Sequence, residues 1–467
     1  MDISLYVKQF NNNTLIYSVM SQIHLSFVNT TTSGINMIVS WVKVGTTTEF
    51  SYNFIFPLIG FSIITTIASI AYCRRDQHAI FDCYVYNSAV FNFTSRDTVT
   101  CGMCCAYLIL FTCCILSGIE INPILEKITY CNDEHDTCII QSPTTVAMLS
   151  PIKTVYSAPM YNLSPQTKYN YRISESAKPI EFTTLNPMNP RIAFIGDFGY
   201  NNAVSYNALH NAMNEYDMVV HLGDIAYNLE TNGDDFMKMI EPISSKIPYM
   251  TTPGNHEVAN NFSYYNTLFN MPRMFYSFNI GTMHVISLSS ELLFNPHFYS
   301  NFNVMKQFNW LERELRENIN ATTKIVYAHR PMYCSLSSNR CSKDTETMRK
   351  GMSYNANGRI APLEQLLYNY GVQLYFAGHI HSYERSKPVY DNKVQNDGIV
   401  HILNGVGGCS ETLDTTTSNR PSWLDYHNTT YGFGILNVDK KNMEWRQYAT
   451  NKEGKTEIID TSFYMNK

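Results

Sequence analysis

Five short stretches between residues 197 and 381 carry side chains of the types that hold metal ions in proteins. They read Gly-Asp-Phe-Gly, Gly-Asp-Ile-Ala-Tyr, Gly-Asn-His-Glu, Val-Tyr-Ala-His and Gly-His-Ile-His. Singly each is a weak signal, because Gly-Asp most often makes a turn. Together they supply two carboxylates, an amide oxygen, three imidazoles and a phenol, a mixture that suits iron, zinc or manganese. The candidate metal ligands are Asp197, Asp224, Tyr227, Asn255, His329, His379 and His381.

The spacing of the candidates favours two metal ions. Asp197, Asp224 and Asn255 follow one another at intervals of about 30 residues, which fits consecutive βα units. Asp224 stands where one carboxylate would bridge two ions, and two-metal hydrolases hold such ions about 3.5–4 Å apart. We therefore expect a dinuclear centre.

The elements that must position these residues belong to an α/β domain, which we place at residues 191–467. Short apolar strands are expected at 192–195, 218–220, 325–327 and 374–376, with helices such as 203–215 and 305–318 between them. Each strand is followed by one of the candidate ligands. The carboxyl ends of strands are where an α/β sheet places its site.

The chain before residue 191 has a different pattern. Residues 22–50 and 141–186 alternate apolar and polar side chains as strands do, which predicts a split β-sandwich. Residues 51–140 form an anomalous Cys-rich apolar insert, in which 54–73 and 101–119 have the length of membrane-spanning helices. A transmembrane hairpin there would interrupt the sandwich, so we favour a tract that does not belong to the mature protein.

Cysteines and sequons indicate an oxidising compartment. Of twelve cysteines, Cys131/Cys138 and Cys334/Cys341 are spaced as short-range disulfide pairs, and Cys409 is left over. Several Asn-x-Ser/Thr sequons agree with a glycoprotein that is secreted or lysosomal, with membrane attachment as the alternative if the insert is genuine. Residues 1–20 lack the basic start and apolar run of a signal peptide. The net charge of −5 argues against nucleic acid as a partner.

The five stretches resemble the metal-binding signature of purple acid phosphatases, within the metallophosphoesterase superfamily. The resemblance spans residues 191–450, and residues 329–334 and 378–385 are particularly similar to the long-chain animal and protist members. It implies a four-layer αββα sandwich preceded by a fibronectin-III-like β-sandwich. It also implies two ligand sets: Asp197, Asp224, Tyr227 and His381 for Fe(III), and Asp224, Asn255, His329 and His379 for a divalent zinc, iron or manganese ion.

Tyr227 is the residue that discriminates between related enzymes. A free phenol titrates near pH 10, so only a strongly charged ion keeps it ionised in acid. Position 199 is Gly where other metallophosphoesterases usually have His. We therefore expect an acid phosphatase that hydrolyses monoesters of small molecules or proteins by metal-bound hydroxide, with His256 as the catalytic residue.

The match is weaker after His329. Plant-type members carry histidines nine or ten residues later, but this chain has Ser338, Asn339 and Arg340. The leaving-group acid is therefore open, and Arg330 and Arg340 either bind substrate anions or have structural roles.

Two other functions fit the sequence less well. A metallophosphodiesterase or nucleotidase is disfavoured by Tyr227. An inactive, membrane-attached binding protein is disfavoured by the intact ligand set, because a decayed site would be expected to lose its ligands first.

Overall fold

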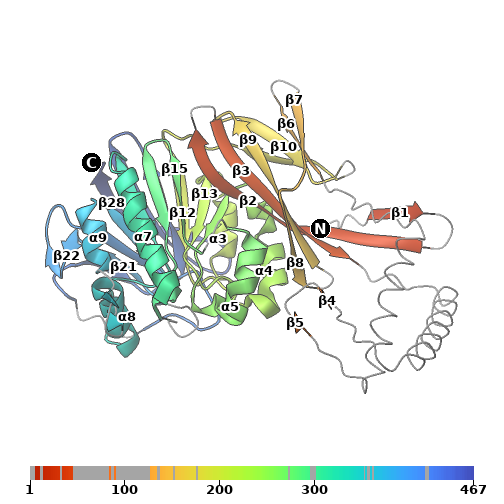
Figure 1. Ribbon diagram of the computed structural model, residues 1–467. Coiled ribbons are helices and arrows are strands. Elements are labelled where there is room, and N and C mark those ends of the chain that lie inside the picture. The colour runs from red at the N-terminus through yellow and green to blue at the C-terminus, as the bar shows by residue number, and fades with distance from the viewer. Residues whose placement is uncertain are drawn as a thin grey trace, which may run out of the picture. The chain divides into compact units, whose positions relative to one another are not determined.

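The computed structural model describes most of the chain outside the expected insert (Figure 1). The described residues are 6–10, 14–31, 34–45, 84–85, 89–90, 127–133, 137–150, 153–174, 177–271, 274–294, 301–351, 353–354, 358–359, 362–415 and 420–466. Both apolar runs of the insert lie outside them. Among the helices within these ranges, none is long and apolar enough to cross a membrane.

The chain divides into two compact units. One comprises residues 1–6, 17–45 and 126–467, and the other comprises residues 7–16 and 46–125. In the second unit the described residues include a short hairpin of β4 (Tyr84–Val85) and β5 (Ala89–Val90).

Two antiparallel sheets precede the α/β domain. The first has the order β1 (Tyr6–Phe10), β2 (Thr14–Thr31), β3 (Gly34–Gly45), β9 (Lys153–Leu163) and β8 (Thr145–Ser150). The second has the order β11 (Ile180–Thr183), β10 (Lys168–Arg172), β6 (Ile128–Asn132) and β7 (Thr137–Gln141). Buried side chains of both sheets, such as Trp41 and Tyr171, belong to one apolar cluster.

The second sheet takes in residues that we expected to belong to the insert. Strand β6 pairs with β10, and the disulfide Cys131–Cys138 joins β6 to β7. Residues 128–132 and 137–141 are thus strands of the sandwich, although the expected insert extends to residue 140. The assignment of the other residues of the insert to a separate segment stays a prediction.

Buried polar contacts tie the sandwich to the α/β domain. The hydroxyl of Tyr171 donates to the carbonyl of Ser245 over 2.6 Å, and that of Ser244 donates to the carbonyl of Ile23 over 2.8 Å. His24 is buried and lies 3.1 Å through Nε2 from the carbonyl of Phe269, to which it donates. These bonds satisfy groups that burial would otherwise leave unpaired.

Two mixed sheets form the α/β domain. The six-stranded sheet runs β14 (Tyr249–Thr251), β13 (Met218–His221), β12 (Arg191–Ile195), β26 (Gly432–Val438), β27 (Asn442–Thr450) and β28 (Thr456–Met465). The seven-stranded sheet runs β15 (Tyr276–Ile280), β16 (Met283–Ser287), β17 (Thr323–Tyr327), β20 (Leu374–Ala377), β24 (Val400–Asn404), β21 (Tyr383–Ser386) and β25 (Leu424–Asn428).

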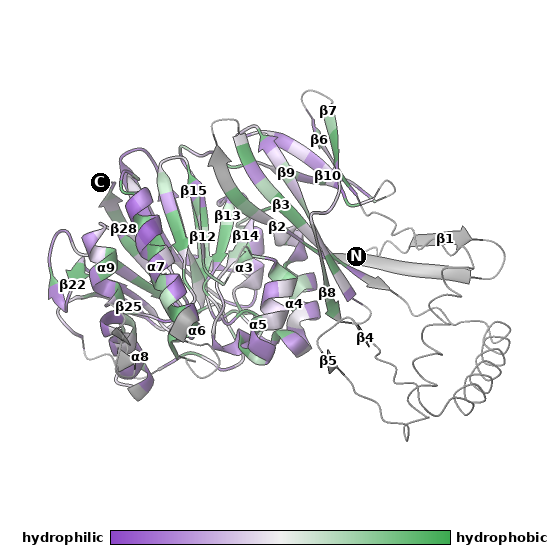
Figure 2. Ribbon diagram, viewed as in Figure 1, coloured by the Kyte–Doolittle hydropathy of each residue, from purple (hydrophilic) through white to green (hydrophobic). Residues whose placement is uncertain are grey.

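The two sheets pack on each other through aromatic side chains. Phe194 of β12 stacks on Phe376 of β20 with ring centroids 3.8 Å apart, and Trp445 of β27 contacts both rings. Strands covered on both faces are apolar throughout, because neither face meets water. Figure 2 shows this for β12 and β13, whose residues are largely hydrophobic.

Helices cover the outer faces and complete four layers. Phe236 of α4 packs on His221 of β13, and Trp310 of α7 packs on Phe275 beside β15. The expected αββα arrangement is confirmed. The helices are α3 (Tyr206–Asn211), α4 (Leu229–Ser244), η1 (Asn255–Glu257), α5 (Ala259–Phe269), α6 (Glu291–Phe294), α7 (Asn301–Glu317), α8 (Asn339–Lys350) and α9 (Leu363–Asn369). Two small hairpins pair β18 (Ser353–Tyr354) with β19 (Gly358–Arg359) and β22 (Val389–Tyr390) with β23 (Lys393–Val394).

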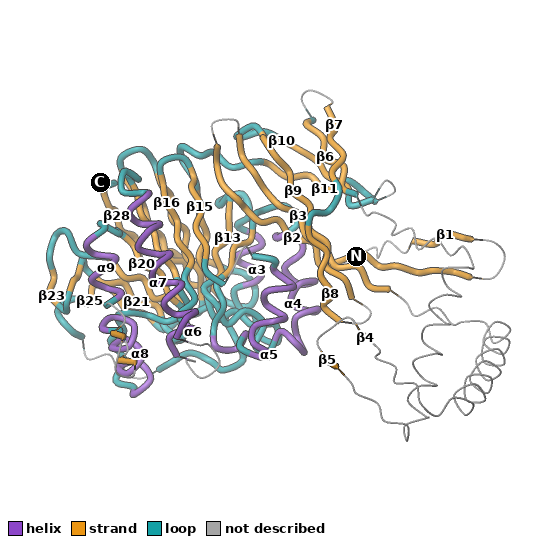
Figure 3. The backbone as a smooth tube through the Cα atoms, in the orientation of Figure 1, coloured by secondary structure: helices purple, strands orange, loops and turns teal. Residues whose placement is uncertain are grey.

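The parallel strands set the position of the site. Strands β12, β13 and β14 are parallel to one another in one sheet, as are β16, β17, β20 and β24 in the other. The loops that follow their carboxyl ends gather at one end of the strands, near α5 and α6 (Figure 3).

Candidate metal centre

The seven candidate ligands lie in these loops, as predicted. Asp197 follows β12, Asp224 and Tyr227 follow β13, Asn255 begins η1 after β14, His329 follows β17, and His379 and His381 follow β20. Four of them have positive φ angles, of 55° at Asp197, 50° at Asp224, 50° at Tyr227 and 73° at His379. Residues other than glycine rarely adopt this conformation, and such strain concentrates at functional sites.

Two glycines of the motifs are required by close approach of the carboxylates. A Cβ atom at Gly254 would lie 2.2 Å from Oδ1 of Asp224. A Cβ atom at Gly378 would lie 2.4 Å from Oδ2 of Asp197. Any side chain at either position would displace a candidate ligand.

One group of ligand atoms converges around Nε2 of His329. This atom lies 3.2 Å from Oδ2 of Asp224, 3.1 Å from Oδ1 of Asn255 and 3.1 Å from Nδ1 of His379. Nδ1 of His329 is 2.9 Å from the carbonyl of Leu222, a contact that requires the proton on Nδ1. In the neutral ring Nε2 then presents a lone pair to the oxygens of Asp224 and Asn255, and either a proton or a metal ion at this point satisfies the group.

The electrostatics of this group agree with a bound cation. Burial alone raises the pKa of Asp224 and lowers that of His329, but their mutual attraction outweighs it. The pKa of Asp224 falls well below its usual range, and that of His329 rises to about 9. The cluster therefore favours a positive charge at its centre.

A second group converges around Tyr227. Its hydroxyl oxygen lies 2.9 Å from Nε2 of His381 and 3.5 Å from Oδ1 of Asp197. Nδ1 of His381 is 2.7 Å from the carbonyl of Thr412, so its proton sits there and Nε2 faces the group with a lone pair. Burial, followed by the charges of Asp197 and Asp224, raises the pKa of Tyr227 far above its ordinary value. Only a strongly charged cation would make this phenol ionise.

Glu257 supports the first group and was not assigned a role from the sequence. Its side chain is buried, and Oε2 accepts from the backbone N–H of Asp224 at 2.9 Å and of Gly254 at 2.8 Å. Oε1 accepts from the N–H of Ile225 at 2.9 Å. The carboxylate thus joins the loop after β13 to the loop after β14.

His256 lies at the edge of the centre. Its side chain is 24% exposed, whereas that of Asp224 is 3% exposed. Nε2 of His256 lies 3.3 Å from Oε1 of Glu411 and 3.9 Å from Oδ2 of Asp224, and its ring is 4.3 Å from that of Tyr227. A substrate that reaches the metals would meet this imidazole. Glu411 was not singled out in the sequence, because it follows none of the five motifs.

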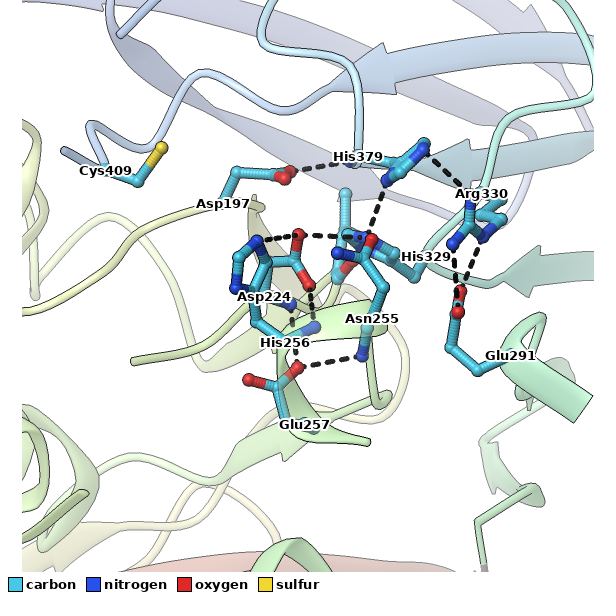
Figure 4. Close-up of polar contacts among 12 residues, drawn as sticks. Asp197, Asp224, Asn255, His256, Glu257, Glu291, His329, Arg330, His379 and Cys409 are labelled. Carbon is cyan, nitrogen blue, oxygen red and sulfur yellow. Dashed lines mark hydrogen bonds and ion pairs between the residues drawn. The ribbon is translucent and has the colours of Figure 1, made fainter. Parts of the chain in front are cut away.

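The two arginines after β17 are both paired with carboxylates. Arg330 donates to Glu291 (Figure 4). It also donates to Asp344 and is largely buried. Arg340 donates to Asp414 over 2.8 Å, and Asp414 accepts from the N–H of His381 over 2.9 Å. Both contacts favour structural roles over direct binding of substrate anions.

Three further residues adjoin the centre or the core. Cys409 has a buried thiol 3.7 Å from either ring nitrogen of His381. His221 bonds to the hydroxyl of Tyr249, and His401 packs against aromatic rings. Neither histidine joins the ligand groups. The second predicted disulfide, Cys334–Cys341, is also present.

Comparison with known families gives two adjoining matches. A model of calcineurin-like phosphoesterases matches residues 190–383, which contain all seven candidate ligands. A model described as iron/zinc purple acid phosphatase-like protein C matches residues 398–461.

Named relatives and a solved structure agree with these matches. The chain is 35% identical over 338 residues to acid phosphatase type 7 of Mus musculus, covering 66% of this chain and 76% of the relative. It is 30% identical over 313 residues to purple acid phosphatase 22 of Arabidopsis thaliana, covering 62% and 67%. The structure of purple acid phosphatase PPD1 from yellow lupin superposes with a TM-score of 0.61 at 17% identity, covering 97% of this chain and 79% of that one.

Proposed function

The chain belongs to the purple acid phosphatase family, and from that premise we propose how its own residues hold the metals and act on a substrate. It is an acid phosphatase, and the family implies a dinuclear centre that contains iron. We assign Asp197, Asp224, Tyr227 and His381 to Fe(III), and Asp224, Asn255, His329 and His379 to a divalent ion. The observation that carries this assignment is the convergence of carboxylate, imidazole, amide and phenol side chains in two neighbouring groups.

The chemical types of the donor side chains decide which group would bind Fe(III) and which would bind the divalent ion. The group around Tyr227 contains the phenol, which needs the more strongly charged ion. The group around His329 contains two imidazoles and a neutral amide, which suit a divalent zinc, iron or manganese ion. Asp224 lies against His329 and also raises the pKa of Tyr227, so it faces both groups and is the proposed bridge.

The residues at the edge would handle the substrate. When bound, the metal ions supply Lewis-acid activation of the phosphate ester and of water. His256 would hold a proton at Nε2, oriented by Glu411 at 3.3 Å, and deliver it to the leaving oxygen. Because Arg330 and Arg340 are paired with carboxylates, the positive charge that binds the phosphate would come from the ions.

Two features support a glycoprotein in an oxidising compartment. The disulfides Cys131–Cys138 and Cys334–Cys341 require such a compartment in most cells. The sequon residues Asn162, Asn261 and Asn320 are exposed, as an acceptor of a glycan must be. We propose secretion or delivery to the lysosome. Loss of mass on treatment with an N-glycosidase tests the glycans, and an unchanged mass contradicts them.

A direct assay separates the proposed reaction from its alternatives. The full chain, loaded with iron and zinc, is given para-nitrophenyl phosphate and, separately, bis-para-nitrophenyl phosphate at acid pH. We expect kcat/KM for the monoester to exceed that for the diester. A preference for the diester would contradict the monoesterase assignment, and turnover of neither would favour a binding protein.

A further inference from the structure

Two side chains contact Nε2, the outer nitrogen of His379, and a third holds one of them in place. Oδ2 of Asp344, on α8, lies 2.8 Å from Nε2 of His379. Nη1 of Arg330 lies 3.0 Å from the same nitrogen and 2.6 Å from Oδ2 of Asp344. Glu291, on α6, binds the far side of Arg330 (Figure 4). The side chains are 5% exposed at His379, 8% at Asp344, 11% at Arg330 and 0% at Glu291, so water screens this network little.

The two contacts at Nε2 require opposite tautomers of His379. Asp344 is an acceptor and needs a proton on Nε2, which leaves Nδ1 with a lone pair. Arg330 is only a donor and needs the lone pair on Nε2, which places the proton on Nδ1. Nδ1 is the atom that faces His329 in the first ligand group, 3.1 Å away. Only the tautomer that bonds to Asp344 can therefore bind a metal ion.

Arg330 fixes the position of Asp344 rather than competing with it. Nε and Nη2 of Arg330 donate to the two oxygens of Glu291 over 2.7 and 3.0 Å. The guanidinium also lies 4.2 Å from the ring centroid of Phe294, which adds a cation–π contact. With both sides held, Nη1 directs one hydrogen to Asp344. The carboxylates of Glu291 and Asp344 and the guanidinium of Arg330 together carry a net charge of −1. This charge beside His379 favours the binding of a cation.

We propose that Asp344, held by Arg330 and Glu291, is a positioning residue that selects the metal-binding tautomer of His379 and so sets the affinity of the divalent-metal site. The inference rests on the proposed role of His379 as a ligand. Asp344 itself touches neither the metal nor the substrate in this scheme. Carboxylates that orient a ligating histidine in this way change metal affinity by roughly 10–100-fold.

A graded pair of variants tests the proposal in the full-length, metal-loaded protein. Asp344→Asn keeps an acceptor oxygen but removes the charge, and Asp344→Ala removes both. We expect the dissociation constant for Zn²⁺, measured by competition with a chelator, to rise about 10-fold in the first and up to about 100-fold in the second. Iron content should stay at the wild-type level, because His379 is not in the group around Tyr227. Asp344→Glu should restore part of the affinity.

The matched control is Glu346→Gln on the same helix, where the carboxylate is exposed and pairs with Lys350. It removes the same charge and should leave the affinity unchanged. In the Asp344 variants Arg330 is still paired with Glu291, so no buried charge is left without a partner. Urea unfolding should therefore show that these variants are folded. If Asp344→Ala binds Zn²⁺ as tightly as the wild type, the proposal for Asp344 is wrong, but the ligand assignment of His379 is unaffected. A wild-type chain that binds Zn²⁺ at no site, or whose affinity is unchanged in His379→Ala, would overturn the ligand assignment as well.

Discussion

Replacing Glu257 with glutamine tests how the loop that carries Asp224 is held. The two oxygens of Glu257 accept three backbone N–H groups, those of Asp224, Ile225 and Gly254, at 2.8 to 2.9 Å. Glutamine has one acceptor oxygen, so its amide must face at least one N–H that it cannot bond. A buried donor left unpaired costs about 1–3 kcal/mol, and Glu257→Gln should lower the free energy of unfolding by that amount.

The loss should also appear at the metals. Because Asp224 is the proposed bridge, a displaced loop should lower the content of both ions. Urea unfolding followed by fluorescence measures the free energy, and elemental analysis measures the ions. Glu453→Gln, at an exposed turn, is the control for the replacement of Glu by Gln itself. A change in unfolding free energy within about 0.5 kcal/mol, as for ordinary surface positions, would refute the role of Glu257.

Three further predictions concern acid stability, a buried ion pair and catalysis. Burial lowers the pKa of His24 from 6.5 to about 4, so the contribution of neutral His24 to the free energy of unfolding is fully present above pH 6.5. On the order of 3 kcal/mol of that free energy is lost as the pH falls to 4, because the unfolded chain takes up the proton first. In urea unfolding, His24→Gln should lose less free energy of unfolding over that pH range than the wild type, and an equal loss would contradict this. Asp460→Asn should cost about 1–3 kcal/mol, because asparagine offers one acceptor oxygen to a buried Arg385 that donates two bonds there, while Arg385 keeps its ion pair with Asp425. The exposed Asp235→Asn should cost under about 1 kcal/mol by thermal unfolding, and similar melting temperatures for the two variants would argue against this difference. His256→Gln should lower kcat by about 10²–10⁴-fold in the monoester assay with both metals retained, and unchanged turnover would exclude proton transfer by His256.

The clustering of the candidate ligands was predictable because of a general property of α/β sheets. Asp197, Asp224 and His329 each follow an expected apolar strand, and parallel strands bring their carboxyl ends to one edge. The order of the strands in the two sheets did not matter to that inference. The apolar runs at 192–195 and 374–376 were likewise sufficient for β12 and β20, since strands covered on both faces are apolar throughout.

The residues that hold the ligands were not predictable in the same way. Asp344 and Glu291 lie on α8 and α6, and neither follows a strand or belongs to a motif. Their role depends on contacts with Arg330 across 14 and 39 residues of sequence, which no local pattern reports. Glu257 stood in the Gly-Asn-His-Glu motif, and its place one turn after Gly254 was the available signal. From the sequence, Arg330 could either bind substrate anions or have a structural role, and its carboxylate partners favour the structural role.

The central claim is that Tyr227 binds a ferric ion, and the visible spectrum of the iron-loaded chain tests it most directly. Phenolate coordination should give a charge-transfer band that colours the protein. Tyr227→Phe should lose the band while the protein still contains iron, because Asp197, Asp224 and His381 remain. A wild-type chain that holds iron but is colourless, or a band that persists in Tyr227→Phe, would contradict the account.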